Sequence, residues 1–409
     1  MNNYSLAIDQ GTTGTTAMIF DIDKKEILAH CNLEFKQYYP KSSWVEHDLN
    51  EIWGTVEETV NKLFINNKIS PSDIKCIGIT NQRETTCAFD NLGNPLEKAI
   101  VWQDKRTTKF CEKSKANYQS LKIKTGLPLD PYFSGTKMKW MLENSKAVAK
   151  ALKEENLKFG TIDTFLLFKL TSGRSFYTEP SNASRTLLLN LETSKWDDEL
   201  ISFFNIPKNT LPEIKNTFDE FGHTKGLTFL PDGIPITCLF GDQQSALFGQ
   251  TCINPGELKC TYGTGGFLLL NTGEEIIHSD NGLLTTVAFR HQEQNVYALE
   301  GSTFIAGAAV QFLRDNLNFF DSSKKIQEIA KKSIEENIED LFFFPFFAGI
   351  GSPHWVPEAK GCIYGMTRNT SQEDISRVCL EGISQSISDL IEAFEADTKT
   401  IHEIRVDGG

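Results

Sequence analysis

The chain has 409 residues, of which 40% are hydrophobic and 23% charged, and its formal net charge is −13. This length exceeds what one hydrophobic core usually supports, so the sequence predicts two domains with a cleft between them. The excess of acidic residues argues against a large nucleic-acid or anionic-membrane surface, because such surfaces need clustered lysine and arginine. Any bound phosphate is therefore expected to be held locally.

The cysteine pattern indicates a reducing environment. The nine cysteines are scattered and never show Cys-x-x-Cys spacing, which argues against a zinc site and against a disulfide framework. The sequence contains no stretch near the ~20 consecutive apolar residues that a membrane-spanning helix needs. We therefore expect a cytoplasmic chain with no membrane span and no nucleic-acid partner.

The first predicted strand, residues 5–9, ends in a turn rich in glycine and threonine, Asp9-Gln-Gly-Thr-Thr-Gly14. Gly11 and Gly14 allow the backbone to turn sharply, so several N–H groups can point at one anion. Asp9 supplies the kind of oxygen ligand that Mg²⁺ prefers, through bound water. The turn therefore indicates a phosphate and magnesium site, although an ordinary hairpin turn explains this segment alone equally well.

The following residues predict two further strands, at 16–21 and 27–33, so an antiparallel meander opens the first domain. A helix comes next, because Asp48-Leu-Asn-Glu51 has the pattern of an N-terminal cap and precedes apolar residues at helical spacing. A short apolar strand at 74–79 then leads into the polar cluster Asn81-Gln-Arg-Glu-Thr85. Open α/β sheets bind ligands at such strand ends, which makes this cluster a candidate binding site.

The second half contains a similar strand, turn and strand at 258–270, with the turn Gly263-Thr-Gly-Gly266. This weak internal repeat predicts two modules that each offer backbone N–H groups to one polyphosphate. Two unrelated hairpin turns are the alternative explanation. Ser371-Gln-Glu-Asp374 then caps a long amphipathic helix, which leads into a strand at 404–406.

Seven motifs carry a resemblance that covers residues 1–409. They are Asp9-Gln-Gly-Thr-Thr13, Asn81-Gln-Arg-Glu-Thr85, Val101-Trp-Gln-Asp104, Asp130-Pro-Tyr-Phe-Ser-Gly-Thr-Lys137, Asn182-Ala-Ser-Arg-Thr186, Gly241-Asp-Gln-Gln244 and Thr261-Tyr-Gly-Thr-Gly265. In this order they resemble the FGGY carbohydrate kinases, a branch of the actin-like ATPase superfold. The resemblance implies an α/β fold of two ribonuclease-H-like domains with an interdomain active-site cleft. The N-terminal domain, 1–240, would carry the polyol site and the first phosphate loop, and the C-terminal domain, 241–409, the nucleotide side.

The resemblance also implies a reaction, the ATP-dependent phosphorylation of glycerol to glycerol 3-phosphate. The cluster Gln82-Arg-Glu-Thr85 resembles the branch of the family that acts on glycerol. Asp242 would be the general base that accepts the proton of the attacking hydroxyl, and Asp9 would organise the Mg²⁺ of ATP through water. The residues alone favour a plainer role for Asp242 as the cap of a helix that begins at this point.

The contacts to glycerol that the resemblance implies combine polar groups for adjacent hydroxyls with apolar surface for the carbon chain. They are Arg83, Glu84, Tyr132, Asp242, Gln243, Trp102 and Phe267. Positions that match the family's nucleotide contacts are Thr12, Thr13, Gly263, Thr264, Gly307, Gln311 and Gly408. From the residues alone, the ordinary role of Arg83 and Glu84 is a surface ion pair, and that of Trp102 and Phe267 is core packing. Gly307 and Gln311 fit a helix-packing surface and an exposed helix position equally well.

Two features depart from the family pattern. Thr16 stands where many members have an arginine, so a cation near the transferred phosphate is missing. The chain ends at Gly409, where relatives continue, and we therefore expect an incomplete second domain. A kinase of another polyol or ketose, such as xylulose, and an inactive polyol-binding homologue are the alternative functions. A homo-oligomer, a dimer or a tetramer, is expected.

Overall fold

The computed structural model describes residues 2–356, 358–398 and 400–408. The chain divides into two compact units. The first unit comprises Met1–Ser245 and Thr286–Val296, and the second comprises Ala246–Thr285 and Tyr297–Gly409. The domain boundary at 240/241 that we expect from the sequence stays a prediction.

A six-stranded sheet with the order β13-β14-β5-β1-β2-β3 forms the first unit. Its strands are β1 (Tyr4–Gln10), β2 (Gly14–Asp21), β3 (Glu26–Glu34), β5 (Ile74–Asn81), β13 (Phe218–His223) and β14 (Pro235–Gly241). β1, β2 and β3 are antiparallel neighbours, which confirms the predicted meander. β5 runs parallel to both β1 and β14, so three parallel strands lie side by side in this sheet.

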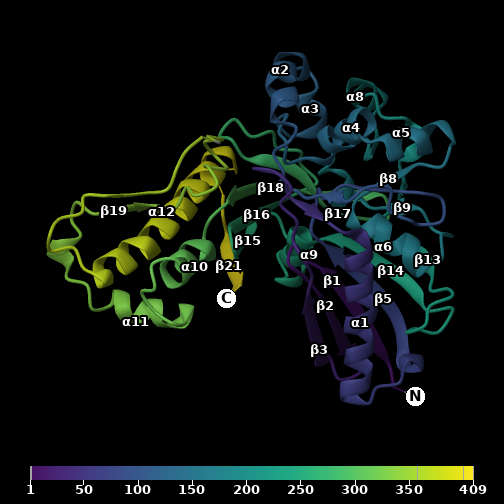
Figure 1. The fold of residues 1–409 in the computed structure, drawn as a ribbon, viewed down its shortest axis with the longest axis horizontal. Helices are drawn as coiled ribbons and strands as arrows, with labels where there is room; N and C mark the ends of the chain where they lie inside the picture. The colour runs from purple at the N-terminus through teal and green to yellow at the C-terminus, as the bar shows by residue number, and fades with distance from the viewer. Residues whose placement is uncertain (1, 357, 399, 409) are drawn as a thin grey trace. The chain divides into compact units, whose positions relative to one another are not determined.

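Helix α1 (Leu49–Asn67) packs along this sheet (Figure 1) and begins after the predicted cap, Asp48, whose side chain accepts a hydrogen bond from the backbone N–H of Asn50. Leu6 and Ile8 of β1 are fully buried in the apolar cluster that α1 and α6 (Ile162–Leu170) share. Because successive side chains of a strand point to opposite faces, Asp9 lies on the other face of the sheet, at the end of β1.

Shorter elements complete the first unit. The helices are α2 (Thr108–Tyr118), α3 (Lys122–Thr125), α4 (Ser134–Asn144), α5 (Lys146–Lys153), α7 (Pro180–Ala183) and α8 (Asp198–Phe204), with the 3₁₀ turns η1 (Pro71–Asp73) and η2 (Lys208–Thr210). The short strands are β4 (Glu46–His47), β6 (Cys87–Phe89), β7 (Ala99–Ile100), β8 (Lys158–Gly160), β9 (Tyr177–Thr178), β10 (Leu189–Asn190), β11 (Lys195–Trp196) and β12 (Glu213–Ile214). They pair in twos outside the main sheet.

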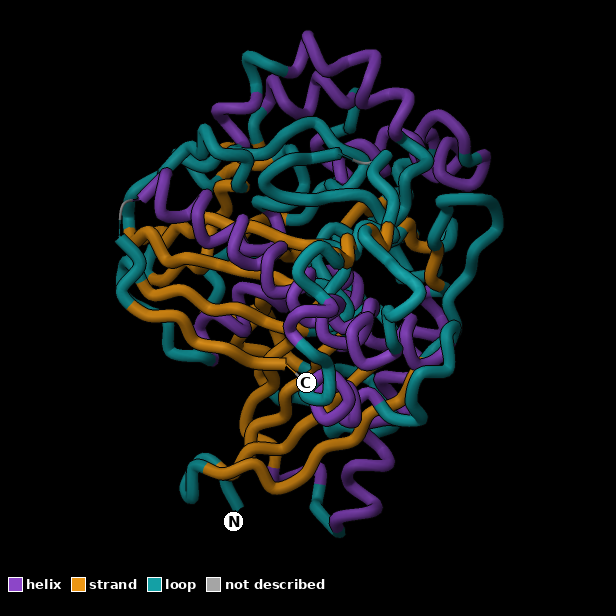
Figure 2. The backbone as a smooth tube through the Cα atoms, turned by 90° about the vertical axis from the view of Figure 1, so that its left-hand side faces the viewer, coloured by secondary structure: helices purple, strands orange, loops and turns teal. Residues whose placement is uncertain are grey.

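A five-stranded sheet has the order β17-β18-β16-β15-β21, and its strands appear in Figure 2 as orange tubes. They are β15 (Glu257–Tyr262), β16 (Gly266–Gly273), β17 (Leu284–His291), β18 (Gln294–Thr303) and β21 (Glu403–Gly408). β15, β16, β21 and most of β18 belong to the second unit, whereas most of β17 lies in the segment 286–296 that is assigned to the first. β15, β16 and β18 are antiparallel neighbours and β21 runs parallel to β15. β1, β2, β3 and β5 have the same order and directions, so the predicted internal repeat is confirmed in the topology.

The predicted long helix is α12 (Gln372–Thr398), which packs on this sheet through an apolar cluster that includes Ile387 and Leu390. Ser371 and Asp374 form the predicted reciprocal cap, since Ser371 N–H donates to Asp374 and Asp374 N–H donates to the Ser371 hydroxyl. The remaining elements are α10 (Gly307–Asp315), α11 (Ile326–Ala330), η3 (Ser323–Lys325), η4 (Glu335–Asn337), β19 (Phe342–Phe344) and β20 (Cys362–Tyr364). None of the helices in the described ranges is long and apolar enough to cross a bilayer.

Candidate active site

The carboxyl ends of three parallel strands meet at one edge of the six-stranded sheet. Gln10 at the end of β1 and Gly241 at the end of β14 are both register partners of Asn81 in β5. The segments that follow these residues therefore begin side by side, and one of them is the start of α9 (Asp242–Gly249). At this edge lie the predicted site residues Asp9, Thr12, Thr13, Arg83, Glu84, Asp242 and Gln243. Open α/β sheets offer ligand sites at such an edge.

Side chains from elsewhere in the unit hold the turn after β1. The N–H of Gly11 donates to the carbonyl of Gly14 at 2.9 Å and closes the turn. The side-chain amide of Gln82 donates to the carbonyl of Gly11 at 3.0 Å, and that of Gln37 to the carbonyl of Thr12 at 2.9 Å. Because its carbonyls are engaged in this way, the turn keeps its peptide groups in fixed orientations, as a preorganised anion site requires.

His47 links the two glutamine side chains behind this turn. Its Nε2 lies 2.5 Å from Oε1 of Gln37, and its Nδ1 lies 3.4 Å from Nε2 of Gln82. Burial lowers the pKa of His47 to about 3, so the ring is neutral and can donate to Gln37 while it accepts from Gln82. His47 and Gln37 were not among the predicted site residues, because both act through contacts that no local motif signals.

Asp9 and Asp242 bring two carboxylates to the same edge. Burial raises the pKa of Asp9 to about 7, and the charge of Asp242 adds to the rise. Asp242 is the first residue of α9, and its Oδ1 accepts the N–H of Gln243 at 2.7 Å, while the role as the cap of this helix stays a prediction. Its side chain is also 33% exposed, which leaves it within reach of a substrate. The position of Asp242 at the start of α9 is thus compatible with a role as general base.

The raised pKa of Asp9 has a consequence for stability. Ionising Asp9 costs more in the folded chain than in the unfolded chain, so the free energy of unfolding falls as the pH rises from about 4 to about 7. We expect Asp9→Asn to unfold with a free energy about 2 kcal/mol higher than wild type near pH ~8 without divalent cations, and the gain to shrink toward pH ~5. Urea unfolding at both pH values measures it.

The control for this prediction is Asp23→Asn, which changes an exposed turn residue and should show no such gain. An Asp9→Asn chain with the same stability as wild type near pH ~8, or with an equal gain at both pH values, would contradict the assignment of this titration to Asp9.

Arg83 lies beside the predicted base. Its side chain is 2% exposed, its Nε lies 3.3 Å from Oδ1 of Asp242, and its Nη1 donates to Oε1 of Gln244 at 3.1 Å. A Cβ at Gly241 would lie 2.8 Å from Cδ of Arg83, so the close approach of this guanidinium requires glycine there. The surface ion pair that the residues alone favoured for Arg83 and Glu84 is therefore wrong, because both side chains are buried.

Glu84 is paired with Arg185, which is fully buried, at 2.5 Å between Oε1 and Nε. The backbone of Glu84 has a φ of 60°, in the left-handed region that residues other than glycine rarely adopt. Its carbonyl accepts the hydroxyl of Ser134 at 2.8 Å. Strained backbone of this kind is typical of functional sites. Arg185 was not among the predicted site residues, although it lies in one of the motifs.

Aromatic side chains connect this pair to the turn after β1. Trp102 Nε1 donates to the hydroxyl of Thr12 at 3.0 Å, and the rings of Trp102 and Tyr132 form a T-shaped pair with centroids 5.6 Å apart. The guanidinium of Arg185 lies 5.4 Å from the centre of the Tyr132 ring. A continuous set of contacts therefore runs from Thr12 through Trp102 and Tyr132 to Arg185 and Glu84.

The predicted nucleotide residues of the second unit form their own cluster. The N–H of Gly307 donates to the carbonyl of Gly263 at 2.9 Å, and a Cβ at Gly307 would lie 2.6 Å from that oxygen. Gly408 has a φ of 99°, and a Cβ there would lie 2.0 Å from the carbonyl of Tyr262. Thr264, next to Gly263, is exposed. These contacts explain why glycine stands at 307 and 408.

Two predicted residues lie outside these clusters. Gln311 is exposed one turn beyond Gly307 on α10. Phe267 lies in β16 of the second unit and is partly buried, whereas Trp102 and Tyr132 belong to the first unit. A role for Phe267 in covering glycerol stays a prediction.

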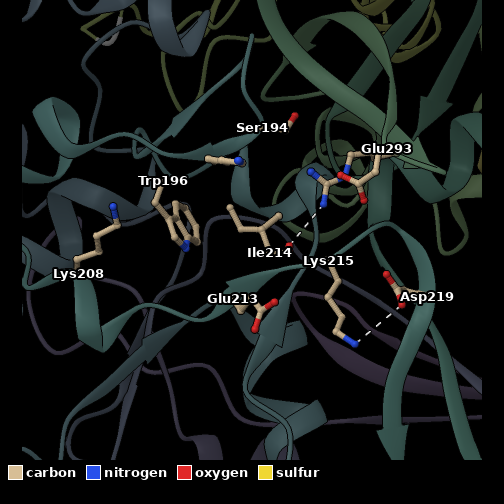
Figure 3. Close-up of a pocket in the computed structure, with 10 residues that line it drawn as sticks. Ser194, Trp196, Lys208, Glu213, Ile214, Lys215, Asp219 and Glu293 are labelled. Carbon is tan, nitrogen blue, oxygen red and sulfur yellow. Dashed lines mark hydrogen bonds and ion pairs between the residues drawn. The ribbon is translucent and has the colours of Figure 1, made fainter.

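A separate pocket of about 540 Å³ lies in the first unit (Figure 3). It is lined by Ser194, Lys195, Trp196, Lys208, Glu213, Ile214, Lys215, Asp219, Arg290 and Glu293, and the predicted site residues are not among them. It is lined by both basic and acidic side chains, and Lys215 lies 3.9 Å from Asp219. The pocket is thus distinct from the candidate active site.

Family models match almost the whole chain. The N-terminal domain of the FGGY family of carbohydrate kinases matches residues 4–249, and the C-terminal domain of that family matches residues 258–409. The chain belongs to this family. The family and the two-domain α/β fold that the sequence predicted are confirmed.

Several FGGY relatives are similar over the full chain. A glycerol kinase of Sinorhizobium fredii is 49% identical, with 100% of this chain and 83% of the relative covered. A glycerol kinase of Staphylococcus haemolyticus is 45% identical, with 100% and 82% covered. The crystal structure of Plasmodium falciparum glycerol kinase with ADP matches this FGGY chain with a TM-score of 0.89 and 38% identity, covering 100% of this chain and 82% of that one.

Proposed function

We propose that this chain is an enzyme that transfers the γ-phosphoryl group of ATP to a terminal hydroxyl of glycerol and releases glycerol 3-phosphate. The observation that carries the proposal is the set of contacts that joins the turn after β1 to the Arg185–Glu84 pair, together with the ion pair of the neighbouring Arg83 with Asp242. These contacts support the proposal because the turn, the polar side chains and Asp242 lie at the same sheet edge. The substrate is supported by relatives at 45% and 49% identity that are named glycerol kinases.

In this proposal the first unit binds glycerol. Arg83 donates to one hydroxyl and Glu84 accepts from the neighbouring one, while Tyr132 and Trp102 cover the carbon chain. The oxygen of the terminal glycerol hydroxyl attacks the γ-phosphorus, and Asp242 accepts the proton of that hydroxyl. The bond between the γ-phosphorus and the oxygen that leaves with ADP breaks. Gln243 and Phe267 complete the proposed glycerol contacts.

Asp9 fits the Mg²⁺ that accompanies ATP, which it would hold through bound water. Within the described ranges, no group of three or more His, Cys, Asp or Glu side chains could hold a metal by itself. A site with one or two carboxylates suits Mg²⁺, which keeps waters and binds phosphate oxygens. Burial raises the pKa of Asp9, and a cation bound nearby would lower that pKa and favour the ionised form. When bound, Mg²⁺ neutralises charge on the phosphate oxygens.

The nucleotide contacts in this proposal are Thr12 and Thr13 in the first unit and Gly263, Thr264, Gly307, Gln311 and Gly408 in the second. Glycine has no Cβ, so at these positions phosphate oxygens can approach the backbone closely. The relative from Plasmodium falciparum was solved with ADP, which supports a nucleotide as the second substrate.

We also propose a location and an assembly. The nine cysteines are free, which suits the reducing cytoplasm. A dimer or tetramer is supported by β19 and β20, on which Phe342 pairs across the strands with Tyr364 and Phe344 lies nearby. These rings are 49%, 65% and 38% exposed, respectively, and exposed apolar patches of this kind mark interfaces.

Binding and turnover together test the proposed function. Calorimetric titration should give saturable heat with glycerol and none with xylulose, and ADP release from ATP should be faster with glycerol than with xylulose, erythritol or ribulose. Faster turnover of another polyol or ketose would overturn the substrate assignment. Glycerol heat without ADP release would identify a binding homologue instead of an enzyme.

A further inference from the structure

Glu179, which has no part in the proposed mechanism, is a fully buried carboxylate that accepts five hydrogen bonds. Oε1 accepts the hydroxyl of Ser181 at 2.5 Å and both the N–H and the side-chain amide of Asn182, at 2.7 and 3.0 Å. Oε2 accepts the N–H of Ser181 and the hydroxyl of Thr217, each at 2.8 Å. All five partners donate, so the ionised carboxylate is the form that these contacts satisfy.

The first connection from Glu179 leads to the end of β14. The Ser181 hydroxyl that donates to Glu179 accepts the backbone N–H of Gly241 at 2.8 Å. Gly241 directly precedes Asp242, the proposed base. The side-chain amide of Gln244 also donates to the carbonyl of Ser181 at 3.4 Å. The position of the peptide before Asp242 is therefore set by Glu179 through one hydroxyl.

The second connection leads to the end of β5. The side chains of Asn182 and Asn81 exchange two hydrogen bonds, at 2.9 and 3.2 Å. The amide of Asn81 also donates to the carbonyl of Gln82 at 2.9 Å, which fixes the peptide before Arg83. Asn81 and Gly241 are register partners, so one buried carboxylate is connected to the ends of two adjacent strands.

We infer that Glu179 is a positioning residue, which through Ser181 holds the proposed base Asp242 and through Asn182 holds the glycerol-binding segment Arg83–Glu84. This inference rests on the proposed function. Two side chains that must meet one small substrate come from different strands, and misplacement of reacting groups by about 1 Å can lower rates by about 10²-fold. Because Glu179 accepts hydrogen bonds from both Ser181 and Asn182, it fixes the position of Asp242 relative to the Arg83–Glu84 segment.

The structure supplies a mutational test that separates the two connections. Ser181→Ala removes the support of Asp242 and should lower kcat by about 10-fold with the KM for glycerol nearly unchanged. Asn182→Ala removes the support of the Arg83–Glu84 segment and should mainly raise the KM for glycerol, by about 10-fold. Glu179→Gln should both lower kcat and raise the KM for glycerol. Glu179→Asp should be more active than Glu179→Gln, because it keeps the charge.

The matched control is Asp374→Asn in the second unit, where a buried carboxylate accepts the hydroxyls of Ser333 and Ser371 and the N–H of Ser371 at the start of α12. It should lose stability while kcat and KM stay near wild type. The inference would be overturned by a folded Glu179→Gln chain with wild-type kinetics, or by Ser181→Ala and Asn182→Ala changing kcat and KM alike. The two single variants decide the matter if Glu179→Gln does not fold.

A wild-type chain that transfers no phosphate would overturn the proposed function instead. Glycerol calorimetry would then decide the inference, since Asn182→Ala should still bind glycerol about 10-fold more weakly than wild type, while Ser181→Ala should not. Equal affinities of wild type and Asn182→Ala would overturn the inference in that case.

Discussion

Asp242→Asn is expected to lower kcat for glycerol phosphorylation by about 10²–10⁴-fold, the range that a positioned general base contributes. An amide does not accept a proton at the working pH. Its oxygen can still accept from the side chain of Arg83 and from the N–H of Gln243, so the surroundings of residue 242 should be kept. ADP release at saturating glycerol measures the loss of kcat.

Glycerol calorimetry is the control for this prediction, because the loss should lie in the chemical step. The dissociation constant for glycerol should stay within about threefold of that of wild type. An Asp242→Asn chain that keeps a tenth or more of the wild-type kcat would contradict the role of Asp242 as general base.

Glu84→Gln is expected to weaken glycerol binding by about 10–100-fold, because hydrogen bonds to a charged group contribute about 1.5–3 kcal/mol. The same change leaves Arg185 buried without its carboxylate, so the free energy of unfolding should fall by about 3–5 kcal/mol. Calorimetry measures the first effect and urea unfolding the second.

A double variant separates these two effects. Glu84→Gln with Arg185→Gln removes the unpaired buried charge and should regain part of the stability, but it should not regain affinity for glycerol. Glu58→Gln is the matched control, since Glu58 pairs with Lys62 on the surface of α1 and its loss should cost under about 1 kcal/mol. Unchanged glycerol affinity in Glu84→Gln would contradict a direct contact of Glu84 with the substrate.

The elements that the sequence predicted correctly are those encoded within a few residues. The cap at Asp48 and the reciprocal pair of Ser371 and Asp374 are local patterns, and the helices begin there in the structure. The turns at Gly11 and Gly263 and the strands around them are likewise local, so the repeat could be predicted from them.

The contacts that the sequence could not predict join distant residues. Arg185 meets Glu84 across 101 positions, and Ser181 meets Gly241 across 60. The surface ion pair expected for Arg83 and Glu84 was wrong for the same reason, because burial depends on segments that fold over the strand end. Glu179, His47 and Gln37 carry no motif, and their roles depend wholly on such partners.

The central claim is that Asp242 and the groups around it transfer phosphate from ATP to glycerol, and ³¹P NMR of the reaction tests it most directly. Wild-type chain with ATP, Mg²⁺ and glycerol should give the phosphomonoester signal of glycerol 3-phosphate together with an equal amount of ADP, and Asp242→Asn should give neither in the same time. ADP with inorganic phosphate, no phosphate transfer from a folded wild-type chain, or glycerol 3-phosphate formed equally fast by Asp242→Asn, would contradict the account.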